Sequence, residues 1–340
     1  MLLVGKPSLR FPFGLFYFSF STYDLESSIL LDKKEPQIRT PNDSNDIVIS
    51  DRFEIIRNDY KAPKYPLVLC HGLSGFDKLI LLPSLKFLHA ADTRKPELSG
   101  FSIDYWNGIK EALQDIGCTV LTGKVPPFGT IRERAEKLDS FIEKEAAALL
   151  KATHCGADSK PIKVNLIAHS MGGLDCRYLI TKLQQSNYEV MSLTTIATPH
   201  YGSAMADWCQ KYASKALLPK SISELSINSM KTFNQEVLDK NNVKYFSYGA
   251  RFCPNLSYVF FPSWKIIFDM EGDNDGMVSV TSSKWGTYLG TLDNVDHLDL
   301  INWRNEARVA INLLMFKKGL KFNAVALYLE IADQLAREGL

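Results

Sequence analysis

The fold of this chain is decided by the stretch Val164-Asn165-Leu166-Ile167-Ala168-His169-Ser170-Met171-Gly172-Gly173. Its apolar, β-prone first half leads into a Ser among small residues, and a helical apolar pattern follows from Leu174 to Leu183. This order predicts a strand, a sharp turn and a helix, as in Gly-x-Ser-x-Gly with Ala168 in place of the first Gly. Such a turn lifts the Ser170 hydroxyl clear of the sheet, next to a helix N-terminus that favours negative charge. We therefore expect Ser170 to be a nucleophile. The alternative is a buried strand before a core helix, with an incidental Ser.

Composition argues against several classes of function. The chain has 340 residues, 46% of them hydrophobic, which is enough for one large domain or two ordinary domains. Its 39 basic and 38 acidic residues give a net charge of +1, which does not predict a nucleic-acid partner. The six cysteines show no metal-ligand spacing and indicate free thiols in a reducing compartment. We expect no cofactor and no metal. We also expect no transmembrane segment, because no apolar run approaches the roughly 20 residues that span a bilayer.

The N-terminal region differs in composition from the rest of the chain. Residues 1–23 contain no Asp or Glu but carry Lys6, Arg10, hydroxyl residues and an aromatic cluster, a composition typical of mitochondrial presequences. The cluster also fits the core of a short secretory signal or a membrane-surface anchor, and these alternatives stay open. Residues 32–46 are polar, contain two prolines and indicate a linker. We therefore expect an N-terminal extension over residues 1–45 and a folded domain over residues 46–340.

Strands and helices alternate along the expected domain. Besides the stretch around Ser170, strands are predicted at 65–70, 118–121, 191–197 and 244–248, and helices at 101–116 and 132–150. This alternation predicts an α/β fold with a mostly parallel central sheet and helices on both faces. Active sites in such sheets lie at the carboxyl ends of the strands. Residues 203–240 break the alternation and predict one or two amphipathic helices inserted as a cap, or alternatively a plain surface helix.

A second turn is expected to complete the site of Ser170. His71-Gly72-Leu73 follows the predicted strand 65–70, at the place where serine hydrolases with this type of sheet carry an oxyanion donor. The backbone N–H groups of Leu73 and of Met171, the residue after the nucleophile, would together bind the oxyanion. The alternative is an ordinary turn between a strand and a helix, which also favours Gly.

A serine nucleophile needs a general base, and two histidines follow Ser170 in the chain. In the order Ser, acid, His that is typical of this sheet type, His297 is the favoured base because it lies in a turn after the acid candidates. His200 precedes every plausible acid and is the second choice. His169 is expected to point elsewhere, because neighbouring residues on a turn do not face each other.

The acid is expected in the loop 272–278, which is polar and contains two glycines, as loops that carry functional residues often are. Asp275, which Gly276 follows, is the first choice and Asp273 the second. Three further carboxylates lie near the base and are interpreted as turn formers or helix caps: Asp293, Asp296 and Asp299.

Six motifs, in this order over roughly residues 65–305, together resemble a known family. They are His71-Gly72-Leu73-Ser74-Gly75-Phe76-Asp77-Lys78, Tyr105-Trp106-Asn107-Gly108-Ile109, Asn165-Leu166-Ile167-Ala168-His169-Ser170-Met171-Gly172-Gly173-Leu174, Thr198-Pro199-His200-Tyr201-Gly202-Ser203, Asn274-Asp275-Gly276-Met277-Val278 and His297-Leu298-Asp299-Leu300-Ile301-Asn302. With them the chain resembles the secreted triacylglycerol lipases of the Pseudomonas–Burkholderia type and, more closely, the mitochondrial triacylglycerol lipases of yeasts. The resemblance to the yeast enzymes extends to the C-terminus.

The resemblance implies an α/β-hydrolase fold and hydrolysis of acylglycerol esters. It implies Ser170 as nucleophile, Asp275 as acid and His297 as base. It further implies Leu73 and Met171 as the oxyanion donors, and a mitochondrial location.

The sequence also departs from the bacterial pattern. Asp299 matches a carboxylate with which the bacterial relatives hold calcium, but Trp303 stands where they have Gln, and no second carboxylate ligand is evident. Calcium is therefore not predicted. The segment expected to form the cap is also shorter than in the bacterial enzymes, which argues against control by a lid.

The sequence thus predicts a lipase that cleaves acylglycerol esters through a Ser-Asp-His triad and an acyl-enzyme, with peripheral contact to a membrane or lipid surface. One alternative is a phospholipase or lipid acyltransferase of the same fold. Another is a catalytically silent module that binds lipid or a partner. A cytoplasmic or lipid-surface-associated location is the alternative to the mitochondrion.

Overall fold

The computed structural model describes residues 8–13, 16–21, 47–50, 52–73, 78–80, 102–152, 160–213, 218–254, 258, 260–303 and 322–340. The chain divides into two compact units, one of residues 1–40 with 80–102 and one of residues 41–79 with 103–340. The first unit contains an antiparallel hairpin of β1 (Ser8–Phe13) and β2 (Phe16–Ser21). The expected linker, residues 32–46, lies outside the described residues, and mitochondrial targeting stays a prediction.

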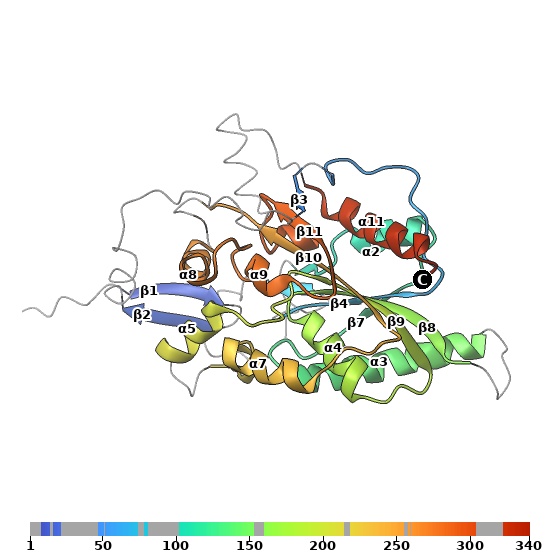
Figure 1. Cartoon of the computed structure of the whole chain (residues 1–340), viewed down its shortest axis with the longest axis horizontal. Coiled ribbons are helices and arrows are strands. Elements are labelled where there is room, and N and C mark those ends of the chain that lie inside the picture. Colours follow the sequence, from blue (N-terminus) through green and yellow to red (C-terminus); the bar gives the residue numbers. More distant parts are fainter. Residues whose placement is uncertain are drawn as a thin grey trace, which may run out of the picture. The chain divides into compact units, whose positions relative to one another are not determined.

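The second unit is built around a seven-stranded sheet in which every neighbouring pair of strands is parallel (Figure 1). The strands lie in the order β3-β11-β10-β9-β8-β4-β7. They comprise β3 (Val48–Ile49), β4 (Leu67–Cys70), β7 (Val120–Gly123), β8 (Ile162–His169), β9 (Tyr188–Ile196), β10 (Lys244–Arg251) and β11 (Thr287–Asp293). Two further strands, β5 (Lys78–Ile80) and β6 (Ser102–Asp104), form a separate sheet. The predicted parallel α/β architecture is confirmed.

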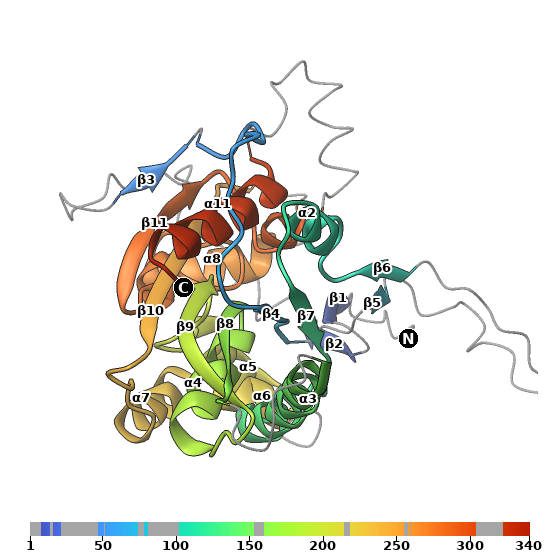
Figure 2. The same cartoon turned by 90° about the vertical axis from the view of Figure 1, so that its right-hand side faces the viewer.

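Helices cover both faces of the seven-stranded sheet. In β4, Leu67 and Leu69 pack into one apolar cluster and Val68 and Cys70 into another, since successive side chains of a strand point to opposite faces. The first face is covered by α2 (Ile109–Asp115) and α11 (Ala324–Arg337), and the second by α3 (Ile131–Ala152) and α4 (Gly172–Lys182) (Figure 1 and Figure 2). The central strands are therefore buried on both sides, as their apolar sequences predict.

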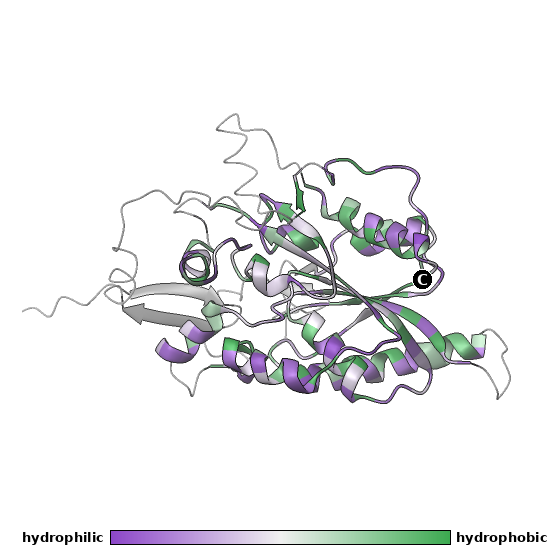
Figure 3. Ribbon diagram, in the orientation of Figure 1, coloured by the Kyte–Doolittle hydropathy of each residue, from purple (hydrophilic) through white to green (hydrophobic). Residues whose placement is uncertain are grey.

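The side chains of α3 explain why this helix lies on the sheet. Ile131, Leu138, Ile142 and Ala146 are buried and recur at helical spacing, so one side of α3 faces the core. The hydropathy colours of α3 alternate accordingly between hydrophobic and hydrophilic in Figure 3. The helix predicted over residues 132–150 is confirmed. Arg134 is the exception on the buried side.

The helix predicted over residues 101–116 is shorter than expected. Residues 102–104 form β6, residues 105–108 form a turn, and α2 begins at Ile109. Gly108 stands just before α2 with a φ of 71°, a left-handed conformation that a continuous right-handed helix does not contain. Gly117, which follows the end of α2, has a φ of 94°, again in the left-handed region.

The expected cap, residues 203–240, contains three described helices instead of one or two. They are α5 (Ala204–Tyr212), α6 (Lys220–Glu224) and α7 (Ile227–Glu236). Ser203 and Ser226 cap α5 and α7, because each side chain accepts a hydrogen bond from a backbone N–H of the first turn. Pro219 directly precedes α6, where its missing N–H costs nothing. These internal start signals divide a segment that its apolar pattern alone does not divide.

Three further elements complete the described structure: α8 (Phe261–Glu271), α9 (Val280–Ser283) and the short 3₁₀ helix η2 (Asp299–Ile301). Within the ranges that the structure describes, no helix combines the length and the hydropathy needed to cross a bilayer.

Leu166 tests the burial of the central strands. It lies in β8 with 0% of its surface exposed, so Leu166→Ala should leave a cavity and lower the free energy of unfolding by about 2–5 kcal/mol. Leu238→Ala is the matched control, because Leu238 is 63% exposed and the change should stay within about 0.5 kcal/mol. Denaturant unfolding followed by circular dichroism measures both. Equal losses in the two variants would contradict this account of the core.

Candidate active site

Ser170 stands on a strained turn between β8 and α4. Its φ of 56° lies in the left-handed region, which residues with a Cβ rarely adopt. Hydrogen bonds hold the turn: the Ser170 N–H donates to the carbonyl of Ile196 over 2.9 Å, and the Gly173 N–H donates to the carbonyl of Ser170 over 3.1 Å. The predicted strand, sharp turn and helix are therefore present, and the Ser170 side chain is partly exposed at the turn.

Glycines make room for this turn. A Cβ on Gly172 would come within 2.6 Å of the backbone oxygen of Cys70, and a Cβ on Gly72 would come within 2.7 Å of the Ser170 Cβ. Side chains do not fit at such distances, so both positions need Gly. The end of β4 and the start of α4 thus meet at Ser170, and the loop 71–73 lies directly against it.

The two expected oxyanion donors, Leu73 and Met171, have side chains in one apolar cluster. Met171 is buried with Ile131, Leu174 and Met230, and Leu73 packs against this group. Leu73 also packs against buried side chains of α5 and α6. The cap, to which Met230 also belongs, therefore helps to hold the loop 71–73 beside the nucleophile's turn.

A buried ion pair fixes the same loop from the other side. Arg134 of α3 lies 2.8 Å from the carboxylate of Asp175 in α4, and both side chains are buried. The Arg134 guanidinium also donates to the carbonyl of His71 over 2.7 Å and to the carbonyl of Pro126 over 3.0 Å. Burial raises the pKa of Asp175 to about 6, although the positive charge of Arg134 opposes this rise. Arg134 therefore links the loop 71–73 to the helix that follows Ser170.

Asp275 is held in one orientation beside His297. Its Oδ1 accepts hydrogen bonds from the N–H groups of Met277 over 3.0 Å and Val278 over 2.8 Å. Its Oδ2 lies 2.7 Å from Nδ1 of His297, and the His297 N–H donates to the Asp275 carbonyl over 3.0 Å. The carboxylate faces Nδ1, which leaves the other ring nitrogen, Nε2, for a nucleophile or a leaving group.

The ring of His297 lies beside the ring of His169, the residue before Ser170. The centres of the two imidazole rings lie 4.5 Å apart. We expected His169 to point away from its neighbour Ser170. Because Ala168 points to the face of α3 and α4, His169 points to the opposite face, where the loop that carries His297 packs. No hydrogen bond joins Ser170 to His297 in the described part of the chain; such bonds are often long before substrate binds.

Tyr105 reaches the site although the sequence analysis gave it no role. Its hydroxyl lies 2.8 Å from Nδ1 of His169 and accepts a hydrogen bond from the Gly72 N–H over 2.9 Å. Tyr105 and His169 are both buried. The signal in the sequence is that Tyr105 opens the second of the six motifs. No local pattern shows that its hydroxyl returns to a turn 33 residues earlier.

The second-choice residues are engaged in other interactions. His200 is buried, lies 3.1 Å from Thr195 Oγ1 and stacks on Trp285. Burial and the nearby guanidinium of Arg177 hold the pKa of His200 well below its usual range. Asp273 forms an ion pair of 2.7 Å with Arg251 on the surface side of the acid loop.

Of the three remaining carboxylates, Asp296 and Asp299 bind N–H groups of their own turn, as expected, whereas Asp293 does not. Asp293 pairs with Arg251 over 2.8 Å. Asp296 Oδ1 accepts from the N–H groups of Leu298 and Asp299 over 2.9 Å and 2.8 Å, and Asp299 Oδ2 accepts from the Asp296 N–H over 3.2 Å. Among the described residues, no group of three or more His, Cys, Asp or Glu side chains is placed to hold a metal ion.

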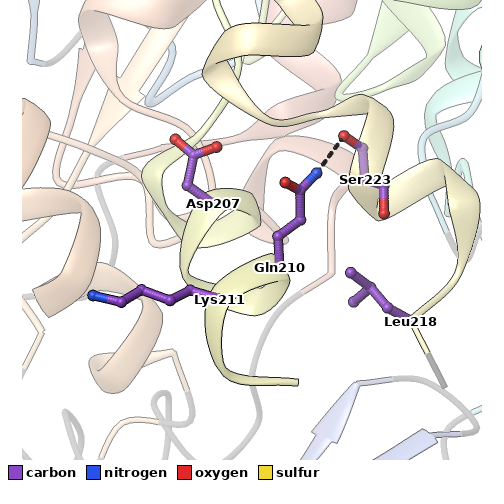
Figure 4. A pocket seen from close by; sticks show the side chains of 5 residues that line it. All are labelled: Asp207, Gln210, Lys211, Leu218 and Ser223. Carbon is purple, nitrogen blue, oxygen red and sulfur yellow. Dashed lines mark hydrogen bonds between the residues drawn. The ribbon is translucent and has the colours of Figure 1, made fainter. Parts of the chain in front are cut away.

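A pocket of about 480 Å³ lies in the cap between α5 and α6 (Figure 4). Its lining is mixed, with Asp207, Lys211 and Leu218 around a hydrogen bond from Gln210 to the carbonyl of Ser223. The lining does not include Ser170, Asp275 or His297, and Leu218 packs in the same apolar cluster as Leu73.

Arg134 offers a test of the buried ion pair. Arg134→Met leaves Asp175 buried without its partner, so the free energy of unfolding should fall by about 3–5 kcal/mol. Arg132→Met is the matched control, because Arg132 lies in the same helix with 71% of its side chain exposed, and an exposed ion pair such as that with Glu136 contributes little to stability. Denaturant unfolding compares the two. The same small loss in both variants would refute the structural importance of the Arg134–Asp175 pair.

Comparisons with known proteins agree on one family. Residues 132–247 match the family model described as "Putative serine esterase (DUF676)". The chain is 41% identical to Triacylglycerol lipase 2 of Saccharomyces cerevisiae over 335 residues, which cover 89% of this chain and 100% of the relative. It is 26% identical to a triacylglycerol lipase of Vibrio cholerae, over 83% of this chain and 90% of that one.

Solved structures agree with the fold. The mature lipase BlEst2 of Bacillus licheniformis matches with a TM-score of 0.53 and 20% identity, over 77% of this chain and 95% of that chain. This likeness confirms the α/β-hydrolase fold. Because the 41% identity extends over 89% of this chain and 100% of the yeast lipase, the chain belongs to the triacylglycerol lipase family and is a carboxylic ester hydrolase of the serine type.

Proposed function

We propose that this lipase cleaves the ester bonds of acylglycerols with Ser170, Asp275 and His297 as its catalytic triad. The observation that carries the proposal is the 2.7 Å contact between Asp275 and His297 beside the strained turn of Ser170. Asp275 is fully buried, and its Oδ1 accepts hydrogen bonds from two backbone N–H groups, which hold the carboxyl group in one orientation. It can therefore orient His297 and stabilise the imidazolium that forms during the reaction.

In the proposed reaction, Ser170 Oγ attacks the acyl carbonyl while His297 Nε2 takes its proton. The backbone N–H groups of Leu73 and Met171 bind the oxyanion, and the N-terminus of α4 adds favourable partial positive charge. The glycerol oxygen leaves with the proton from His297, and the acyl group stays on Ser170. Water, activated by His297, then hydrolyses this acyl-enzyme and releases the fatty acid.

Two observations support an acylglycerol as the substrate. The yeast relative at 41% identity is named a triacylglycerol lipase. The side chains of Leu73, Met171 and Met230 pack together beside the turn of Ser170, so the surroundings of that turn are apolar. The cap exposes Tyr212 and Ile227, by 48% and 41%, and such apolar side chains suit peripheral contact with a lipid surface.

Substitution of the nucleophile tests the proposal. Ser170→Ala should lose labelling by a fluorophosphonate probe and should no longer release fatty acid from emulsified triolein, while its circular dichroism stays that of the wild type. Ser140→Ala is the matched control, because Ser140 lies on the exposed side of α3 and should leave both activities unchanged. Wild-type labelling that persists in Ser170→Ala would refute Ser170 as nucleophile.

The same assay separates the alternative functions. Labelling of Ser170 without cleavage of triolein would move the substrate to a phospholipid or a smaller ester. Transfer of the acyl group to an added lipid alcohol, in preference to water, would make the enzyme an acyltransferase. A folded wild type that the probe does not label would be a silent lipid-binding module.

The two acid candidates give a second test. Asp275→Asn keeps the shape of the side chain but removes the charge that orients His297, so kcat should fall by about 10,000-fold. Asp273→Asn is the matched control. Asp273 lies in the same loop as Asp275 but pairs with Arg251 of β10, so this variant should keep most of the activity. Steady-state hydrolysis of a soluble ester measures both. A larger loss in Asp273→Asn than in Asp275→Asn would exchange their roles.

A further inference from the structure

The Tyr105 hydroxyl connects two parts of the active site that the sequence keeps far apart. It lies 2.9 Å from the backbone nitrogen of Gly72 and 2.8 Å from Nδ1 of His169. Gly72 directly precedes Leu73, one of the two proposed oxyanion donors. His169 directly precedes the nucleophile, and its ring packs on the ring of His297. One phenol oxygen therefore contacts the oxyanion loop and the imidazole beside the base.

The directions of these two hydrogen bonds follow from the available protons. A backbone N–H can only donate, so the Tyr105 oxygen accepts from Gly72. The single hydroxyl proton of Tyr105 is then free to point at His169 Nδ1, which must be an acceptor without a proton. Neutral His169 consequently carries its proton on Nε2. Tyr105 and His169 are 3% and 1% exposed, so no bulk water competes for these groups.

The surroundings keep His169 uncharged. Burial lowers the pKa of His169 well below its usual range, the neighbouring His297 lowers it further, and the backbone of His297 opposes this only in part. A proton on Nδ1 would also leave the Tyr105 oxygen facing two donors, with its own proton without a partner. His169 Nε2 is itself buried and has no hydrogen-bond partner among the described residues. The Tyr105 hydroxyl is thus the polar contact that sets the tautomer of His169.

We propose that Tyr105 and His169 are positioning residues of this lipase: the Tyr105 hydroxyl fixes the peptide of Gly72, and with it the Leu73 N–H, while it holds His169 as the uncharged imidazole against which His297 packs. This inference rests on the proposed roles of Leu73 and His297. Neither Tyr105 nor His169 touches the reacting atoms in this account. Both act through the placement of the oxyanion donor and of the base.

The proposal assigns a definite kinetic signature to the hydroxyl. Negative charge develops at the oxyanion and positive charge on His297 in the same transition state, so an error in either position raises the barrier of the chemical step. Binding of the ground-state ester uses the acyl-chain site and should change little. Loss of the hydroxyl should therefore lower kcat and leave KM nearly unchanged.

Tyr105→Phe is the direct test. It removes the oxygen and keeps the ring that packs against Trp106 and His71. We expect kcat for a soluble ester to fall by about 10- to 100-fold with KM within about 2-fold of wild type, because displacements of catalytic groups by about 1 Å cost up to about 100-fold. Affinity for an alkyl boronic acid, which forms a tetrahedral adduct with the nucleophile, should fall by the same factor as kcat/KM.

Tyr188→Phe is the matched control. Tyr188 is 2% exposed, and its hydroxyl donates over 2.6 Å to Asp139 of α3, a residue outside the group around Ser170. Both variants lose a buried hydroxyl, so both should be destabilised. The comparison is between kcat and boronate affinity in Tyr105→Phe and in Tyr188→Phe. If both quantities fall to the same extent in the two variants, in proportion to their loss of stability, Tyr105 has a merely structural role and the proposal is wrong.

A pair of variants at His169 keeps the proposal testable should Tyr105→Phe fail to fold. His169→Asn retains an uncharged acceptor near the position of Nδ1 and should keep kcat within about 5-fold of wild type. His169→Leu removes the acceptor and should lose about 10-fold or more, as expected when a positioning contact is lost. Equal activity in Asn and Leu variants would overturn the role of the Tyr105 contact.

Failure of this inference is distinguishable from failure of the proposed function. Fluorophosphonate labelling of Ser170 in the wild type, with undiminished kcat in Tyr105→Phe and His169→Leu, would refute the positioning roles and leave the triad intact. Labelling that persists in Ser170→Ala would refute the triad and the positioning roles together.

Discussion

The close contact of β4, the Ser170 turn and the start of α4 is the constraint on which the rest of this structure depends. Gly72 and Gly172 have no space for a Cβ, because Ser170 and the end of β4 fill it. This contact requires β4 and β8 to be neighbours, and their parallel pairing sets Cys70 opposite Ala168. The carboxyl ends of both strands then lie side by side, and the two loops that follow them form one site. The strain of the left-handed Ser170 is supported by this packing.

The interactions around the turn are of different physical kinds. Apolar side chains of the cap hold Leu73 and Met171 from one side, whereas Arg134 binds the carbonyl of His71 from the other. A buried ion pair such as Arg134 with Asp175 contributes little net stability, because the desolvation of both charges offsets their attraction. Its directional hydrogen bonds instead set the orientation of a loop, which apolar packing alone defines less sharply.

Local patterns in the sequence predicted the elements that depend on near neighbours. The turn of Ser170, five of the seven strands of the central sheet (β4, β7, β8, β9 and β10), α3 and the loop that carries Asp275 follow from hydrophobic period, Gly positions and motif order. The edge strand β3 and its neighbour β11 were not predicted. The same patterns separated Asp275 from Asp273 and His297 from His200, and the structure gives each second choice a partner elsewhere. The reasoning did not find the break before α2 or the division of the cap into three helices, because single residues with special backbone or capping roles decide both.

Contacts between distant segments were beyond local patterns. The pairing of Arg134 with Asp175 joins residues 41 positions apart, and a charged residue within a charged amphipathic helix gives no sign of being buried. The position of His169 against His297 requires two facts that no motif contains: the face to which the end of β8 points, and the face on which the loop after β11 packs. Sequence patterns predict the residues that we propose to react, whereas tertiary packing determines which residues orient them.

The charges around His297 follow from this arrangement. His297 lies between the buried carboxyl group of Asp275 and the ring of His169, whose pKa burial holds well below its usual range. The positive charge of Arg134 is paired with the carboxylate of Asp175. In the proposed reaction, an imidazolium formed at His297 would lie between the carboxyl group of Asp275 and the ring of His169. Burial lowers the pKa of His169, and a charged imidazole whose ring centre lies 4.5 Å away would oppose the positive charge that the proposed mechanism places on His297.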